Sequence, residues 1–299
     1  MVQISDGTST QIISPESFYR GEEPTFDVIK KNLDVVKRSL LRKVTEKISE
    51  VLSEQSTVVP ILFLSGSYGT GKTTFCYRII SELIHDEDFD ALGFEVFDAS
   101  KLKPADLEVL FSSAKSKNIV LFFNGIEVDS AFRSLIDFRS KISSEQFQNF
   151  KVLLLASIRE NILNKYQSRQ SHPNTIELNV DTPFTEDEAR DLVEKLGAAR
   201  LVEFRDARER NVIANKIVSE YSGDTLVSLI SLVSESAHDN IVRDAYLQLT
   251  PLAQSAFLYT SLLYRFNIQM SASLLRSLLG KTWEELTKEV LQLEVTQLG

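Results

Sequence analysis

The stretch GSYGTGKT, residues 66–73, constrains the fold of this chain more than any other feature. It fits the pattern G-x-x-x-x-G-K-[ST], in which glycines let the backbone turn tightly and point N–H groups at phosphate oxygens. The apolar run ILFLS (61–65) precedes it, and KTTFCYRIISELI (72–84) follows with helical spacing. The order of strand, glycine loop and helix predicts a phosphate-binding loop. In a chain of this length the pattern arises by chance on the order of one time in a hundred.

The residue types of this loop predict separate roles in binding. Lys72 is expected to reach the β- and γ-phosphates, and the Thr73 hydroxyl to bind Mg²⁺. A glycine-rich turn without a ligand is the alternative interpretation. The residues expected to surround the phosphates are Gly66, Ser67, Tyr68, Gly69, Thr70, Gly71, Lys72, Thr73 and Thr74.

Further apolar runs predict the rest of a sheet. They are separated mostly by segments of helical spacing, and strands that alternate with helices favour a parallel sheet covered on both faces, an α/β fold. Beyond Asp181 only helical patterns follow, and Thr185 with Glu188 forms a capping-box pattern before a helix that we expect to end at Gly197. The four expected strands after the loop cover residues 93–99, 118–124, 151–157 and 175–180.

The predicted domain organisation follows from these changes of pattern. Residues 1–17 are polar and predict a linker or tail, and the apolar spacing between Thr25 and Ser53 predicts one or two helices. We expect a nucleotide-binding domain over 18–180, a helical domain over 181–245 and a further helical unit over 246–299.

The strand expected over 118–124 ends in Asn124 and Gly125, where nucleotide hydrolases need an acidic residue to hold magnesium. Asn124 can accept a hydrogen bond from a metal-bound water, but it has no charge and cannot act as a base. Glu127 and Asp129 lie beyond the usual position. A weakened magnesium site at Asn124 and an ordinary Asn-Gly turn both stay open, and either predicts slow hydrolysis.

Arg159 ends the run LLLASIR and is a candidate sensor of the γ-phosphate, because a guanidinium suits phosphate oxygens. A surface arginine in an ordinary loop is the alternative. Lys72, Arg159 and Asn124 are therefore the candidate catalytic residues, and Thr73 with Asn124 the candidate metal ligands.

Together these parts resemble the STAND class of signal-transduction ATPases, which is related to the AAA+ proteins. The segment FYRGEEPTF resembles the family's adenine-packing motif, and its form is similar to that of STAND domains fused to sirtuin-like or other effectors in bacterial antiphage proteins. The resemblance implies that adenine lies between this segment and the helical domain. The residues that match the motif are Phe18, Tyr19, Arg20 and Gly21.

The resemblance also implies the architecture and the partners. The fold would be a five-stranded sheet of order 5-1-4-3-2, a helical domain and a winged-helix domain, and the ligands ATP or ADP with Mg²⁺. Self-association and effector or sensor domains in a longer chain are implied. Tyr221, Ser222 and Gly223 stand where many members have Gly-x-Pro, and no Met-His-Asp motif occurs in the terminal helices.

Composition excludes several function classes. The net charge of −9 and pI of about 5.1 offer no broad basic field to nucleic acid. No apolar run approaches the roughly 18 residues of a membrane span, and the single Cys76 agrees with a reducing compartment, so we expect a cytoplasmic location. The three widely spaced histidines have no metal-ligand neighbours. They are His85, His172 and His238.

These observations favour an ATP-binding switch module whose effector lies outside this segment. Two other functions remain as alternatives. One is a DNA-binding initiator or loader ATPase, which the acidic residues 281–299 oppose, and the other is a structural module with a degenerate nucleotide site, which Asn124 favours and the intact Lys72 opposes.

Overall fold

The computed structural model describes the chain in two compact units, Met1–Val233 and Ser234–Gly299. Each unit is considered by itself. The described residues are 2–4, 12–53, 58–67, 69–86, 89–114, 118–126, 129–142, 151–160, 163–164, 174–233, 246–247, 249–264, 270–287 and 290.

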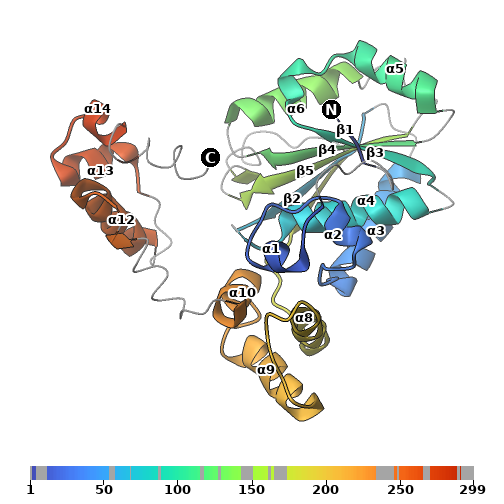
Figure 1. Ribbon diagram of the computed structural model, residues 1–299. Coiled ribbons are helices and arrows are strands. Elements are labelled where there is room, and N and C mark those ends of the chain that lie inside the picture. Colours follow the sequence, from blue (N-terminus) through green and yellow to red (C-terminus); the bar gives the residue numbers. More distant parts are fainter. Residues whose placement is uncertain are drawn as a thin grey trace. The chain divides into compact units, whose positions relative to one another are not determined.

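The first unit is built on a six-stranded sheet of order β1-β3-β4-β5-β2-β6 (Figure 1). The strands β2, β3, β4, β5 and β6 all pair in parallel with their neighbours among these five. The expected α/β fold with a parallel sheet is therefore confirmed. If β2 is counted as the first of these five strands and β6 as the fifth, their order in the sheet, starting at β6, is 5-1-4-3-2. The strands are β1 (Val2–Ile4), β2 (Ile61–Gly66), β3 (Ala91–Val96), β4 (Asn118–Ile126), β5 (Val152–Arg159) and β6 (Thr175–Asn179).

Strand β1 corrects the expectation of a five-stranded sheet preceded by a polar linker over 1–17. It pairs antiparallel with β3, from Val2 opposite Glu95 to Ile4 opposite Gly93, and buries Ile4. Helix α1 (Pro15–Tyr19) then begins within the same expected linker. Three residues are too few to show a period of two, so this edge strand had no signal in the sequence.

Helices cover both faces of the sheet (Figure 1). On one face lie α2 (Asp27–Lys30), α3 (Arg38–Ser53) and α4 (Lys72–His85), so the expected helical region after Thr25 is two helices. On the other face lie α5 (Pro104–Ala114) and α6 (Asp129–Ile142), with a short 3₁₀ turn, η1 (Ala99–Lys101), before α5.

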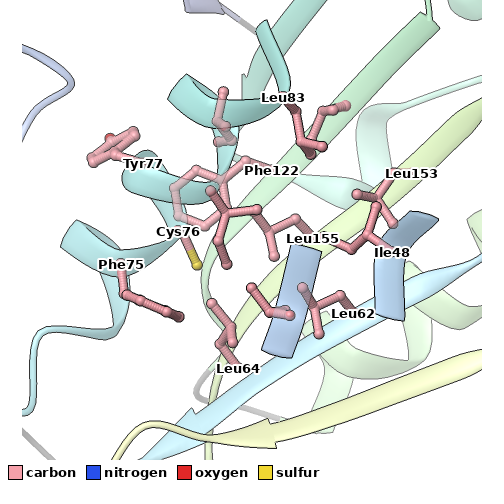
Figure 2. Close-up of a cluster of buried hydrophobic side chains, with 14 of the residues drawn as sticks. Ile48, Leu62, Leu64, Phe75, Cys76, Tyr77, Leu83, Phe122, Leu153 and Leu155 are labelled. Atoms are coloured by element: carbon pink, nitrogen blue, oxygen red, sulfur yellow. The ribbon is translucent and has the colours of Figure 1, made fainter. Parts of the chain in front are cut away.

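The strand side chains alternate between two cores, as the period of two in a strand requires. Leu62 and Leu64 point to the α4 face, whereas Ile61 and Phe63 join the cluster under α5 and α6. Figure 2 shows the first of these clusters, in which Cys76 of α4 lies among side chains of β2, β4 and β5. Both faces are buried, which explains why these strands read as continuous apolar runs.

A third core joins the helical segment to the N-terminal part of the chain. It packs α8 (Glu186–Ala198), α9 (Ala207–Ser219) and α10 (Thr225–Val233) around Leu192, Val193 and Ile217, and Tyr19 of α1 is part of it. The capping box at α8 is confirmed, because Thr185 Oγ1 accepts from Glu188 N at 3.3 Å and Glu188 Oε2 accepts from Thr185 N at 2.9 Å.

Helix α8 ends at Ala198, one residue after the glycine expected at its end, and Gly197 does not have the positive φ of a helix-ending glycine. A Cβ at Gly197 would lie 2.5 Å from the ring of Phe204. The glycine therefore makes room for that ring in the helical core. A tertiary contact of this kind cannot be distinguished from a helix stop by local sequence alone.

The described part of the second unit is helical, as expected. Its helices are α12 (Pro251–Tyr264), α13 (Ala272–Leu279) and α14 (Trp283–Leu286). The winged-helix domain over 246–299 stays a prediction, as does the boundary at 245, which lies outside the described residues.

Candidate nucleotide-binding site

The phosphate-binding loop connects β2 to α4 at the carboxyl edge of the sheet. Gly71 is the N-cap of α4 and has φ +83°, in the left-handed region that favours glycine. The loop therefore leads directly into the start of α4, and the N-terminus of a helix is a geometry that binds an anion. Tyr68 lies outside the described residues.

Lys72 extends back over this loop. Its Nζ donates to Gly66 O at 3.0 Å and to Ser67 O at 2.6 Å. Thr70 Oγ1 donates to the same carbonyl of Ser67 at 2.9 Å. The ammonium charge thus lies inside the turn, where it can attract the phosphates of a nucleotide.

Asn124 of β4 lies beside the loop, as expected for the residue at the strand end. Its Oδ1 accepts from Thr73 Oγ1 at 2.9 Å and from Ser157 Oγ of β5 at 3.0 Å. Ser157 Oγ in turn accepts from Gly125 N at 2.7 Å. The structure therefore brings together Thr73, Asn124 and Ser157 in a chain of hydrogen bonds in which no member is charged.

This set of donors fits Mg²⁺ poorly. Magnesium in nucleotide sites is held by one or two carboxylates together with waters and phosphate oxygens. The Thr73 hydroxyl is a suitable ligand, but Asn124 Oδ1 has no charge and already accepts two hydrogen bonds. Among the residues that the structure describes, no group of three His, Cys, Asp or Glu residues could hold a metal ion.

Arg159 ends β5 and lies opposite Gly66 of β2 in the register of the two strands. Its backbone is therefore next to the first residue of the phosphate loop, and its side chain is exposed. The position agrees with the expected γ-phosphate sensor, which stays a prediction.

An apolar cavity adjoins the loop and contains about 590 Å³ of empty space, part of it open to solvent. Thr70, Gly71 and Thr74 form one side of it, next to the expected phosphate positions. Phe18 and Tyr19 of α1 form another side, with Leu33 and Val35 of the following segment. Tyr19 is fixed there because its hydroxyl donates to Leu33 O at 2.6 Å.

The helical segment, residues 181–233, also contributes to the cavity lining. The residues that it contributes are Phe184, Leu192, Thr225 and Leu229, from the entry of α8, from α8 and from α10. Helix α10 also touches the loop directly, because a Cβ at Gly69 would lie 2.8 Å from the Leu226 side chain. A flat apolar ligand group attached to phosphates on the loop would thus contact both α1 and the helical segment.

Arg20 and Gly21, the other two residues of the expected adenine-packing motif, are not among the cavity residues. Arg20 Nε forms an exposed ion pair with Glu16 at 3.2 Å, and Gly21 has φ +97° after the end of α1. Their roles in nucleotide binding stay predictions.

Two charged residues that were not predicted from the sequence contact the site. Asp181, which follows β6, accepts from Ser67 N at 2.9 Å with both carboxylate oxygens and from Ser67 Oγ at 2.8 Å. Lys37 Nζ donates to Val180 O and Thr182 O, each at 2.8 Å, on either side of Asp181. Burial lowers the pKa of Lys37.

A third missed contact is a buried ion pair, one member of which, Asp34, lines the cavity. Arg78 of α4 binds Asp34 through two guanidinium nitrogens, and Asp34 is 3% exposed. This bidentate pair holds the segment before α3 against the helix that follows the phosphate loop. These partners are 44 residues apart, so no local pattern indicates them.

The histidines, Cys76 and the segment 221–223 lie outside the phosphate loop. His85 Nδ1 contacts Ser81 O at 2.7 Å at the end of α4, whereas His172 and His238 lie outside the described residues. Cys76 is fully buried, and this burial raises the pKa of its thiol. Tyr221, Ser222 and Gly223 form the turn before α10.

The sequence profile of a known family, the novel STAND NTPase 5 family, matches residues 16–171, which contain the phosphate loop, Asn124 and Arg159. The chain belongs to this family. The expected membership of the STAND class is therefore confirmed, and with it a nucleotide-binding module. No curated protein matches the sequence of this STAND NTPase.

Several solved structures resemble this STAND NTPase in fold. A RuvB variant from Thermotoga maritima has 17% identity and a TM-score of 0.44 and covers 88% of each chain. The ORC2 protein of Aeropyrum pernix has 14% identity and a TM-score of 0.46, over 84% of this chain and 80% of its own. Trip13 from Rhizobiales has 13% identity and a TM-score of 0.46, over 75% of this chain and 89% of its own.

In the described part of this chain, no helix is long and apolar enough to cross a bilayer.

Proposed function

We propose that this STAND NTPase is a switch module in which the bound nucleotide, ADP or ATP, controls self-association and the activity of an effector outside this segment. The phosphates bind on residues 66–74 and adenine binds in the cavity between α1 and the helical segment. The setting proposed is a cytoplasmic signalling protein of antiviral defence, with a sirtuin-like or other effector domain elsewhere in a longer chain.

The observation that carries this proposal is the composition of the cavity. Thr70 and Gly71 of the phosphate loop share it with Leu192 of α8 and Leu229 of α10. A nucleotide there contacts the helical segment as well as the sheet. A ligand that contacts two elements differently in two states is what shifts an equilibrium between those states.

The chemistry of the site supports a switch with slow hydrolysis. Asn124 cannot act as a base, and its oxygen is committed to Thr73 and Ser157. Arg159 next to Gly66 is the group proposed to distinguish ATP from ADP, because only ATP has a γ-phosphate for it to contact. The lifetime of the bound nucleotide would then set the state of the switch.

The test is to purify the protein without added nucleotide, denature it and identify any released nucleotide by chromatography. Wild type is expected to release ADP or ATP. Lys72→Ala is expected to release neither, because a lost charge-assisted contact of about 2 kcal/mol weakens binding by about 30-fold.

Lys43→Ala is the matched control, because Lys43 is an exposed residue of α3. It should release as much nucleotide as wild type. The proposal fails if wild type releases no nucleotide and also binds neither ADP nor ATP in a direct titration.

A further inference from the structure

We propose that this site binds the phosphates of ADP or ATP without a divalent cation, and that Asn124 is the residue responsible. The inference rests on the proposed function, because it concerns the same nucleotide. It goes further in assigning to a neutral side chain the place where a carboxylate would otherwise hold Mg²⁺.

The side-chain oxygen of Asn124 already accepts two hydrogen bonds. Oδ1 accepts from Thr73 Oγ1 at 2.9 Å and from Ser157 Oγ at 3.0 Å, which uses both of its lone pairs. Ser157 is held in place because its Oγ accepts from Gly125 N at 2.7 Å. An oxygen with both lone pairs engaged cannot also bind a cation or a cation-bound water without breaking this arrangement.

The side-chain nitrogen of Asn124 can donate to a phosphate. Asn124 Nδ2 is a donor, and none of the residues that the structure describes accepts a hydrogen bond from it. Asn124 is only partly buried, so Nδ2 is open to an acceptor that enters the site. A phosphate oxygen is such an acceptor, and binding it directly requires no bridging metal.

The neutral charge of Asn124 also affects how the phosphates bind. A carboxylate beside bound phosphates repels them, and a divalent cation is needed to offset that repulsion. Asn124 introduces no such charge. Lys72 Nζ inside the loop and the N-terminus of α4 attract the phosphates, and the Asp181 carboxylate on Ser67 is the opposing charge at the loop. Asn124 adds no second negative charge beside them, so less positive charge is needed at its position than a carboxylate there would require.

The experiment is a calorimetric titration of the nucleotide-free full chain with ADP, in excess magnesium and in EDTA. The dissociation constants of wild type are expected to agree within about threefold. Asn124→Asp restores the carboxylate at nearly the same volume, and its dissociation constant is expected to be at least about tenfold higher in EDTA than in magnesium.

Asn215→Asp is the matched control, because it makes the same substitution on an exposed part of α9. Its ratio of dissociation constants should equal that of wild type. Glu127→Gln and Asp129→Asn should also leave the wild-type ratio unchanged. A change in either would show that an acidic residue after β4 holds a cation, and would overturn the inference.

The outcomes separate this inference from the proposed function. Wild-type binding that needs magnesium overturns the inference alone, whereas absence of ADP binding in both buffers overturns the proposed function as well. If Asn124→Asp does not fold, elemental analysis of the copurified wild-type complex decides instead. We expect less than about one magnesium ion per ten nucleotides, and a ratio near one to one would contradict the inference.

Discussion

Gly223 and Gly125 have nearly the same backbone angle but different surroundings. Their φ values are +67° and +65°, both in the left-handed region. A Cβ at Gly223 would lie 2.7 Å from the backbone nitrogen of Phe184, whereas a Cβ at Gly125 would meet nothing within 4 Å. Phe184 N also donates to Gly223 O at 2.9 Å, so the two backbones are held close together. Of these two glycines, Gly223 alone therefore combines the cost of the angle with a steric clash.

Gly223→Ala is expected to lower the free energy of unfolding by about 3 kcal/mol, and Gly125→Ala by about 1 kcal/mol. The smaller value is the cost of a non-glycine residue in this backbone region, and the difference is the clash with Phe184. Urea denaturation with linear extrapolation measures both. Equal losses for the two variants would show that the contact with Phe184 contributes nothing.

At the scale of elements, helix α14 begins with a capping box. Thr282 N donates to Glu285 Oε2 at 2.9 Å, Thr282 Oγ1 donates to the same oxygen at 2.9 Å, and Glu285 N donates to Thr282 Oγ1 at 3.3 Å. The bond from the Thr282 backbone, followed by that from its hydroxyl and by Lys281, lowers the pKa of Glu285 from 4.5 to about 2.

The sign of the pH effect follows from this shift. Because the pKa of Glu285 is lower in the folded state, the cap stabilises α14 above pH 4.5, and this contribution is lost as the pH falls towards 2. Thr282→Ala removes the hydroxyl bond and is expected to raise the pKa of Glu285, as measured by NMR titration of its carboxyl carbon. Thr287→Ala is the control, since Thr287 Oγ1 donates to Trp283 O instead. An unchanged pKa in Thr282→Ala would show that the hydroxyl is not part of the cap.

The strands and the phosphate loop were predictable because their signals are local. The phosphate loop can be predicted from residues 66–73 alone, and a buried strand such as β5 can be predicted because it is a continuous apolar run. The capping box at Thr185 was predictable for the same reason, since its two partners are three residues apart.

The contacts that complete the site were not predictable in this way. Asp181 and Ser67 are separated by 114 residues, and Lys37 binds carbonyl groups more than 140 residues away. Asp and Lys are common surface residue types, so neither Asp181 nor Lys37 stands out in the sequence. Only the fold brings them to the loop. Ser157 lies within the apolar run LLLASIR, but its bond to Asn124 depends on the register of β4 and β5.

At the scale of the whole molecule, the candidate site lies within the first of the two compact units. The phosphate loop, the cavity residues and the three hydrophobic cores all belong to Met1–Val233. The fragment 1–233 is therefore expected to fold alone and to bind ADP within about threefold of the affinity of the full chain. Circular dichroism and calorimetric titration test this. A folded fragment with affinity reduced by about tenfold or more would show that residues 234–299 contribute to the site.

The segment Val180–Phe184 has a mechanical consequence for this unit. Asp181 is bound to the phosphate loop, Lys37 holds the carbonyls on both sides of it, and Phe184 is bound to Gly223 in the turn before α10. These five consecutive residues are thus held by hydrogen bonds to three parts of the chain, which are Ser67, Lys37 and Gly223. We therefore expect a movement of α8 and α10 against the sheet to change the position of Ser67, and a change of the loop to move those helices. Residues 180–184 thus link Ser67 of the phosphate loop to the turn before α10 through hydrogen bonds near both of their ends.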